Sequence, residues 1–459
     1  MVKKILLTLL ILLGLALVII FLGASSYETT VEENQYETKN FDFVGYHDLN
    51  GNSTFKMALH QVGEKWYLYC AHFSAKGWSI IDVTNPAQPR FVKFLKNPEK
   101  NTNNGQIQIA DNLMITALER PLTDLLDIVP WQGYAWLVRQ TLLGKLPYKP
   151  WAYTPNGVLI WDVADPENPK LLSKWSNESL GTHRNFYDGG DYLYLTANRQ
   201  NFEGNFLIIL DISNPKSPKE IGEYYLPGQS PLSSVKPTEH GYYLHGPSHV
   251  KGDTAYLPYG IEGCRILDIT DKSNPKEIGK WEEPDSLGSP QGTHTFLPLT
   301  NRPYAIINSE AHGERCIGDK GKMYTAIMDL QDITQPSIVS FFPEPIPSSN
   351  LPYASFCEKG GRVGPHNQHH HNNNPIHFHS DTLVYLTSFN AGLRLYDISD
   401  VQQVKELGYF IPPNPTKRDM VLPSELVLQT EDVIVDKRGY AYISQKNDGI
   451  YIVKYAPKH

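Results

Sequence analysis

Residues 206–224 read FLIILDISNPKSPKEIGEY, and this pattern decides the fold. It is an apolar strand ending in Asp, then an apolar residue, a short polar turn with proline and a second strand. The pattern recurs at 78–94, 158–175, 264–281, 325–342 and 393–410. The aspartate is suited to accept backbone N–H bonds from the turn behind it, and the proline ends strand pairing. We therefore interpret the six equivalent aspartates as turn residues without a catalytic role: Asp82, Asp162, Asp211, Asp268, Asp329 and Asp397.

A second, tyrosine-rich hairpin precedes each of these strand pairs, as in GDYLYLTA (190–197) and GDTAYLPY (252–259), and a seventh copy lies near the end of the chain. Four short strands in each unit of roughly 45–60 residues are typical of propeller blades. The sequence thus predicts an all-β fold, a seven-bladed β-propeller over residues 40–459, with six or eight blades as alternatives. Residues 41–46 (FDFVGY) read like the outer strands, so we expect them to complete the last blade and leave no exposed sheet edge.

The composition is that of a globular protein with an ample core. The 459 residues are 41% hydrophobic and 20% charged, with a net charge of −8. These values exclude an intrinsically disordered chain and a polytopic membrane protein. The acidic balance, without any basic block, argues against nucleic acid as the main partner.

The N-terminus carries an apolar run, residues 5–22, behind Lys3 and Lys4. At 1.5 Å per residue, 18 helical residues reach about 27 Å, close to the roughly 30 Å hydrocarbon core of a bilayer. The sequence therefore predicts a transmembrane anchor over residues 1–24, with a cleavable signal peptide as the alternative. Either segment places the remaining chain on the extracytoplasmic side, periplasmic or extracellular. Residues 25–39 are polar and acidic and are expected to form a flexible tether.

The repeats resemble the LVIVD-repeat family of β-propellers over residues 41–456. The segments 181–195, 245–256, 359–367 and 389–400 are also similar to an exported, largely uncharacterised subgroup of that family. The resemblance implies the propeller fold. It implies no particular function, because propellers carry many unrelated ones.

Four histidines share one position in successive blades. Aligning the blades on their tyrosine-rich hairpins places His183, His245, His294 and His366 at the start of the innermost strands of blades three to six. His366 fits only if an insertion of about eight residues follows it. Because innermost strands line the central channel, we expect these imidazoles to converge on one axis; His249, four residues after His245, is an alternative at its position.

Converging neutral imidazoles are good ligands for a transition metal ion. Iron or copper is favoured, with zinc or manganese as alternatives. Glu310 and Glu431 are the candidate catalytic residues, as carboxylates that orient imidazole N–H groups. The competing interpretation is that the histidines are polar channel fillers without a metal.

Two further features bear on the substrate. Residues 121–155 insert apolar residues, including Trp131, Trp136 and Trp151, into blade two. We expect two short helices there, either capping the channel or entering the membrane interface. Cys316 and Cys357 could form a disulfide in an exported domain.

The sequence therefore predicts a membrane-anchored extracytoplasmic propeller with a histidine-bound metal ion in its channel. The expected activity is oxidoreductase or oxygenase chemistry on a small organic substrate, an apolar one included. The absence of a hydrolase nucleophile motif favours this activity, while metal-dependent hydrolysis or a lyase reaction stays open as an alternative. The alternative is a non-catalytic binding or scaffold propeller at the cell surface.

Overall fold

The structure is a computed structural model. It describes most of the chain, and from residue 12 onward it also describes the side chains. The residues outside the description are 1, 29–34, 73–75, 120–128, 144–155, 178, 180, 237–242, 290, 312, 317–322, 371–372 and 458–459.

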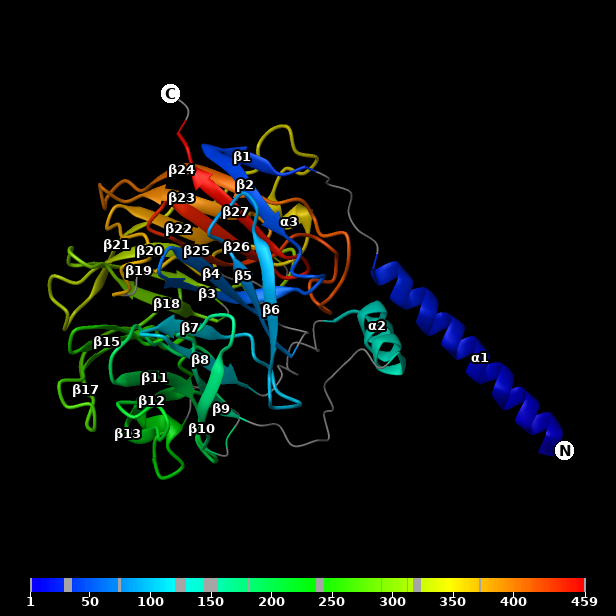
Figure 1. The fold of residues 1–459 in the computed structure, drawn as a ribbon, viewed down its shortest axis with the longest axis horizontal. Helices are drawn as coiled ribbons and strands as arrows, with labels where there is room; N and C mark the ends of the chain where they lie inside the picture. Colours follow the sequence, from blue (N-terminus) through cyan, green and yellow to red (C-terminus); the bar gives the residue numbers. More distant parts are fainter. Residues whose placement is uncertain are drawn as a thin grey trace.

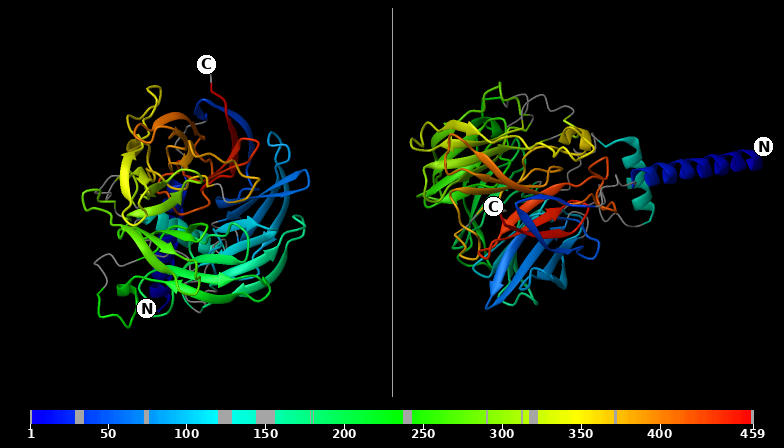
Figure 2. Two further views of the ribbon diagram at one scale, coloured as in Figure 1. Left: turned by 90° about the vertical axis from the view of Figure 1, so that its left-hand side faces the viewer. Right: turned by 90° about the horizontal axis from the view of Figure 1, so that it is seen from above.

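Seven antiparallel sheets surround a central channel, and each sheet is one blade (Figure 1, Figure 2). Blades one to five each take consecutive segments of the chain from the channel outward. Blade one contains β3 (Thr54–Val62), β4 (Lys65–His72), β5 (Gly77–Asp82) and β6 (Arg90–Lys96). Blade two contains β7 (Ile107–Ala110), β8 (Leu113–Leu118), β9 (Gly157–Asp162) and β10 (Lys170–Trp175). Blade three contains β11 (Tyr192–Ala197), β12 (Phe206–Asp211) and β13 (Lys219–Tyr224). Blades four and five contain β14 (His249–Lys251), β15 (Thr254–Pro258), β16 (Cys264–Asp268) and β17 (Lys276–Trp281); and β18 (Thr293–Pro298), β19 (Tyr304–Ser309), β20 (Thr325–Asp329) and β21 (Ser337–Phe341).

The last two blades borrow their outermost strands from the N-terminal segment. Blade six contains β22 (Leu383–Thr387), β23 (Leu393–Asp397), β24 (Lys405–Ile411) and β1 (Glu37–Lys39), and blade seven contains β25 (Thr430–Val435), β26 (Tyr440–Gln445), β27 (Ile450–Tyr455) and β2 (Phe41–His47). The pairing of β2 with β27 confirms the predicted closing strand. The pairing of β1 with β24 was not expected.

The apolar core shows that the ring has seven members. Seven buried clusters each join two neighbouring blades, and the last one returns from blade seven to blade one. In that closing cluster, Leu59 of β3 lies in one core with Ile434 of β25 and Ile452 of β27. Alternating apolar residues of each strand fill both faces of a blade, as the sequence pattern requires. The six- and eight-bladed alternatives are thereby excluded.

The six repeat aspartates make the turn bond that their sequence context predicts. The Oδ1 atom of each accepts a hydrogen bond from the backbone N–H two residues later, at 2.8–3.0 Å. The predicted disulfide between Cys316 and Cys357 is formed, with Cα atoms 5.5 Å apart. Cys70 and Cys264 are buried free thiols.

The N-terminal helix α1 (Val2–Tyr27) projects from one mouth of the propeller, and helix α2 (Trp131–Leu142) crosses its base (Figure 2). The Tyr27 hydroxyl donates to the Val421 carbonyl at 2.6 Å, and Trp136 Nε1 donates to Glu28 at 3.1 Å. Within the described residues no helix is long and apolar enough to span a bilayer. The side chains of residues 1–11 lie outside the description, so the anchor over 1–24 stays a prediction.

The prediction for residues 25–39 differs from the structure, and the prediction of two helices in the insertion is only partly covered by the described residues. The tether predicted over 25–39 has structure at both ends: residues 25–27 continue α1, and 37–39 form β1 because the open edge of β24 satisfies their backbone groups. The insertion over 121–155 contains α2 as its described helix. The rest of that insertion, including Trp151, lies outside the described residues, apart from 129–130 and 143.

The closing strand β2 gives a direct test of the ring. Phe41 is 1% exposed and packs between Tyr385 and Tyr455, whereas Phe43, two residues later in β2, is 40% exposed. Phe41→Ala is expected to lower the free energy of unfolding by about 3–5 kcal/mol because it leaves a cavity in the last blade. Phe43→Ala is the matched control and is expected to cost less than half as much. Urea unfolding followed by tryptophan fluorescence measures both; equal losses would contradict closure through Phe41.

Candidate metal centre

The four register histidines occupy equivalent backbone positions. In blades three, four and six the histidine N–H bonds the carbonyl of Thr196, Pro258 and Thr387, respectively, at the end of the next strand. The partner lies 13 residues downstream in blades three and four (183 to 196, 245 to 258) and 21 in blade six (366 to 387). The difference accounts for the eight-residue insertion inferred after His366. In blade five a β-bulge between Thr293 and Thr295 sets the direction of the His294 side chain.

The four imidazoles form a continuous arc along one side of the channel. Their ring centroids are 5.8 Å apart for His183 and His245, 4.8 Å for His245 and His294, and 5.1 Å for His294 and His366. His294 and His366 are almost completely buried, and His245 nearly so. The structure therefore brings together the side chains that the sequence register selects.

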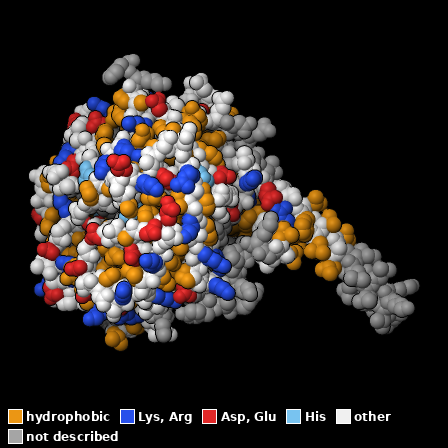
Figure 3. All heavy atoms as spheres, in the orientation of Figure 1, with side chains coloured by type: hydrophobic (Ala, Val, Ile, Leu, Met, Phe, Trp, Pro, Cys, Tyr) orange, Lys and Arg blue, Asp and Glu red, His pale blue; other side chains and the backbone are white. Residues whose placement is uncertain are grey.

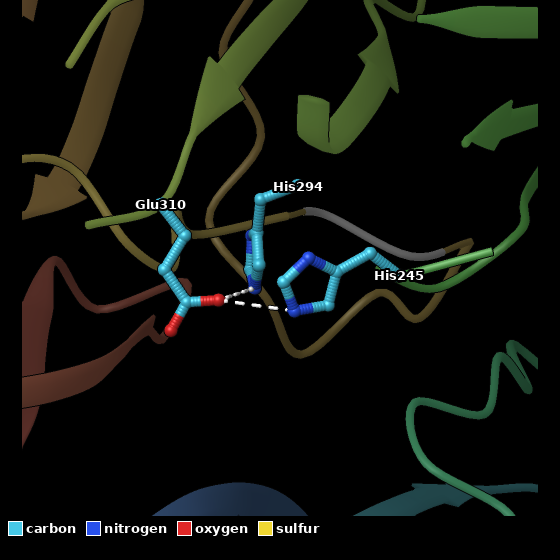
Figure 4. A group of neighbouring side chains, drawn as sticks. All are labelled: His245, His294 and Glu310. Carbon is cyan, nitrogen blue, oxygen red and sulfur yellow. Dashed lines mark ion pairs between the residues drawn. The ribbon is translucent and has the colours of Figure 1, made fainter. Parts of the chain in front are cut away.

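A carboxylate, Glu310, lies at the focus of this arc. It directly follows β19, and its Oε2 atom lies 3.1 Å from His245 Nε2 and 3.4 Å from His294 Nε2 (Figure 4). Its other oxygen, Oε1, lies 3.4 Å from His366 Nε2. The sequence analysis placed Glu310 behind the imidazoles as an orienting acceptor. The structure places it among them.

Arg362 holds Glu310 in its ionised form. Arg362 Nη2 lies 2.5 Å from Glu310 Oε1 and also donates to the Ala311 carbonyl. Burial alone would raise the pKa of Glu310, but Arg362, His294 and His366 together hold that pKa well below its ordinary value. The same burial lowers the pKa of His245, His294 and His366, in the last two cases well below the ordinary value. At neutral pH the centre therefore combines a carboxylate with neutral imidazoles.

His366 is less available as a ligand than the two histidines before it. Its Nδ1 donates to the Glu431 backbone carbonyl at 2.8 Å and lies 3.3 Å from the Glu431 carboxylate. Arginine only donates, so His366 Nε2 must accept the bond from Arg184 Nη2 at 3.0 Å. The backbone carbonyl of Glu431 thus orients this imidazole, while Arg184 occupies the lone pair that a metal ion would need. The predicted role of the Glu431 carboxylate stays a prediction.

His183 stands at the end of the arc with a partner of its own. Its Nδ1 lies 2.6 Å from Glu119 Oε1, and the Glu119 carboxylate also accepts from Asn103. The ligand atoms of His245, His294 and Glu310, by contrast, all lie within 4.8 Å of one another. The side chains placed closely enough to hold one metal ion are therefore two histidines and one carboxylate, and the set of four histidines stays a prediction.

Three charged residues of the site escaped the sequence analysis: Glu119, Arg184 and Arg362. Arg184 follows His183 directly, and Arg362 lies four residues before His366, so proximity to a register histidine was the available signal. His249 does not replace His245, because its Nδ1 bonds the Phe296 carbonyl at 3.0 Å, farther along the channel.

The charges around the arc balance within the described residues. Four carboxylates face four cations: Glu119, Glu310, Glu431 and Asp432, and Lys56, Arg184, Arg362 and Lys446. The Arg184 guanidinium is buried, and its Nε atom has no hydrogen-bond partner. His245 Nδ1 and His294 Nε2 are likewise buried without a hydrogen-bond partner among the described residues. Of these three atoms, His294 Nε2 faces Glu310 at 3.4 Å, and Arg184 Nε and His294 Nε2 are groups that a ligand would be expected to satisfy.

The fold and the site define a class: a seven-bladed β-propeller with a buried histidine–carboxylate cluster at one mouth of its channel. The LVIVD repeat family matches residues 65–95, 189–225 and 249–282, which cover parts of blades one, three and four. The chain therefore contains LVIVD repeats in these three blades, as its motifs indicated. The similarity to an exported subgroup stays a prediction.

Solved structures of other proteins share the general shape at low identity. The periplasmic gluconolactonase PpgL of Pseudomonas aeruginosa is 9% identical, with 86% of this chain and 97% of that chain covered and a TM-score of 0.49. A hypothetical selenium-binding protein of Sulfolobus tokodaii is 12% identical, with 84% and 83% covered and a TM-score of 0.48. A Lactobacillus plantarum protein is 10% identical, with 85% and 90% covered and a TM-score of 0.48. No curated protein matches the chain.

The ion pair between Glu310 and Arg362 is open to a direct test. Glu310→Gln is expected to lower the free energy of unfolding by about 3 kcal/mol, because it leaves the Arg362 guanidinium without its buried counter-charge. Glu425→Gln, which breaks the half-exposed pair with Arg315, is the matched control and is expected to cost less than about 1 kcal/mol. Chemical unfolding of chelator-treated protein measures both. Similar losses would show that the pair at the focus has no special weight.

Proposed function

We propose that this protein binds a transition metal ion, iron first, through His245, His294 and Glu310, and uses it for redox or oxygen chemistry on a small organic molecule. The observation that carries the proposal is the convergence of two buried neutral imidazoles and one ionised carboxylate on one point. A neutral imidazole needs no deprotonation before it binds a metal ion.

The donor set favours iron over copper. Two histidines and one carboxylate with open positions are the ligands of non-haem iron(II) oxygenases. The same set also occurs at catalytic zinc, where it supports hydrolysis. A bound iron ion would supply activation of dioxygen or one-electron chemistry, and the absence of a thiolate argues against a structural zinc site.

The surrounding residues have separate roles in this proposal. Arg362 keeps Glu310 ionised and fixes which of its oxygens faces the two imidazoles. Glu431, in β25 of the neighbouring blade seven, fixes the His366 ring through its backbone carbonyl. Arg184 places a buried positive charge beside the focus, where it would attract an anionic group or developing negative charge on an oxygen atom.

The proposal includes a position at the membrane, on the extracytoplasmic side. Apolar side chains of α1 from Leu12 to Leu22 are exposed, and so is Trp131 of α2, at 56% (Figure 3). A series of contacts connects helices α1 and α2 to the metal centre. Tyr27 bonds Val421, Ser424 bonds Glu314, and Glu314 pairs with Arg362 through a β-bridge. The mouth that holds the histidines therefore faces the same side as the apolar helices.

A second candidate is a binding propeller without chemistry. The balanced charges around the arc favour it, because the cluster is electrically complete without a metal ion. The cluster would then be a polar plug of the channel, and a partner would be held by the loops and by exposed residues such as Trp131. Trp136, which the sequence suggested for the same surface, is buried against α1 and cannot serve.

Metal content of the full-length chain separates the two candidates. After expression with supplemented iron, the wild-type protein is expected to contain close to one metal ion per chain by elemental analysis. His245→Ala and His294→Ala are expected to weaken metal binding by at least about ten-fold, because each removes a direct ligand. His183→Ala is the matched control and is expected to keep the metal, since His183 lies outside the group of ligand atoms that converge within 4.8 Å.

Wild-type protein without metal would contradict the proposal and favour the binding propeller. Zinc in place of iron would retain the site but replace redox chemistry with hydrolysis. Loss of metal in His183→Ala as well would restore the four-histidine arrangement that the sequence predicted.

A further inference from the structure

We infer that a cavity between blades five and six binds the apolar part of an uncharged organic molecule. We also infer that molecules of this class are the substrates of the metal centre. The cavity has a volume of about 400 Å³, which is within the range of roughly 300–1,000 Å³ seen for small-molecule sites. The existence of the cavity is independent of the metal, but its link to a reaction rests on the proposed function.

The walls of the cavity are predominantly apolar. The proline-rich segment 342–347 forms one wall, and Phe356 and the Cys316–Cys357 disulfide form another. Leu386 and Tyr396 of blade six line it from within the sheet. Burying an apolar ligand against such walls is favourable by roughly 25 cal/mol for each Å² removed from water.

The lining residues select against charged ligands. Among the described lining residues, Glu344 is the one charged residue, and none is lysine, arginine or histidine. A carboxylate or phosphate would meet no counter-ion among these described residues and would face the charge of Glu344. Thr325, Ser355 and Ser388 offer neutral polar contacts, which suit a hydroxyl or carbonyl group.

The cavity and the metal centre share one wall. Val363, Gly364 and Pro365 line the cavity, and they directly connect Arg362 with His366, the two residues that contact Glu310 Oε1. Met323, from blade five, also lines the cavity. Its sulfur atom lies 3.9 Å from the Oγ atom of Ser309, and Ser309 directly precedes Glu310 in the chain. Gly364 has φ +122, and a Cβ there would lie 2.9 Å from the Met323 side chain. Only one layer of residues therefore separates the cavity from Glu310.

A photolabelling experiment on the full-length, detergent-purified chain tests this inference. The probe is an uncharged ten-carbon primary alcohol with a diazirine near the end of its chain, and adducts are located by peptide mass spectrometry. We expect adducts in segments 342–347, 354–357 and 363–365, because these line the cavity. The exposed apolar face of α1 will also be labelled and serves as the internal reference. The corresponding ten-carbon carboxylic acid is expected to label the cavity segments less than the alcohol does.

Two variants at the rim make the result specific. Ala354→Trp narrows the cavity, and Ile346→Asp, at a side chain that is 78% exposed, adds a second negative charge beside Glu344. Both are expected to reduce cavity labelling relative to α1 by at least about five-fold. Ala87→Trp, at an exposed turn of blade one, is the matched control and should label like the wild type.

Several outcomes would overturn the inference. Adducts confined to α1 and α2 would show that the cavity does not take up the probe. Cavity labelling that both variants leave undiminished would show that the label arrives from outside, and equal labelling by the acid would refute selection for uncharged molecules. Metal content measured on the same samples keeps the two proposals apart. Labelling of a protein that contains no metal would support the ligand cavity and contradict the metal-dependent reaction. Metal content without cavity labelling would support the metal centre and contradict the ligand cavity.

Discussion

The ion pair between Glu310 and Arg362 is the interaction on which the centre depends. A carboxylate buried among three imidazoles would ordinarily take up a proton, since burial raises its pKa. Arg362 prevents this at 2.5 Å and does so from the loop before blade six, whereas Glu310 belongs to blade five. The pair therefore connects two blades and fixes the charge at the focus. It also leaves Oε2 directed at His245 and His294.

The fold supplies the convergence that this pair completes. In a closed ring, equivalent residues of successive blades point at one axis, so a single register position delivers one side chain from each sector. Strand β2 covers the outer edge of blade seven and completes the ring. Because the ring is closed, the same register position in each blade points toward the central axis. The buried clusters between neighbouring blades hold the sectors at fixed separations, and the centroid distances of 4.8–5.8 Å along the arc follow from them.

Sequence reasoning reached the fold and the histidines because both are written in local periodicity. The strand pattern and the repeated aspartate predict the blades, and a constant offset predicts which residues open the inner strands. The ion pairs across the focus were out of reach for the opposite reason. Arg184 and His366 meet across 182 residues of sequence, and Glu310 meets Arg362 across 52. No pattern in either segment states that pairing. Strand β1 was missed because three residues added to a free edge carry no periodicity.

Charge balance constrains what can enter this centre. Carboxylates of the cluster are already paired with guanidinium and ammonium groups, and its imidazoles are neutral. A divalent cation would therefore add two positive charges to a buried site that has no unpaired negative charge among its described residues to compensate them. An anionic ligand on the metal, such as hydroxide, would offset part of that charge, and Arg184 with its unpartnered Nε atom lies beside the focus as a donor to it. An uncharged organic molecule held behind the wall of residues 363–365 would add no charge of its own. The positive charge of Arg184 therefore disfavours a metal ion without an anionic ligand and stabilises one that carries a small anion.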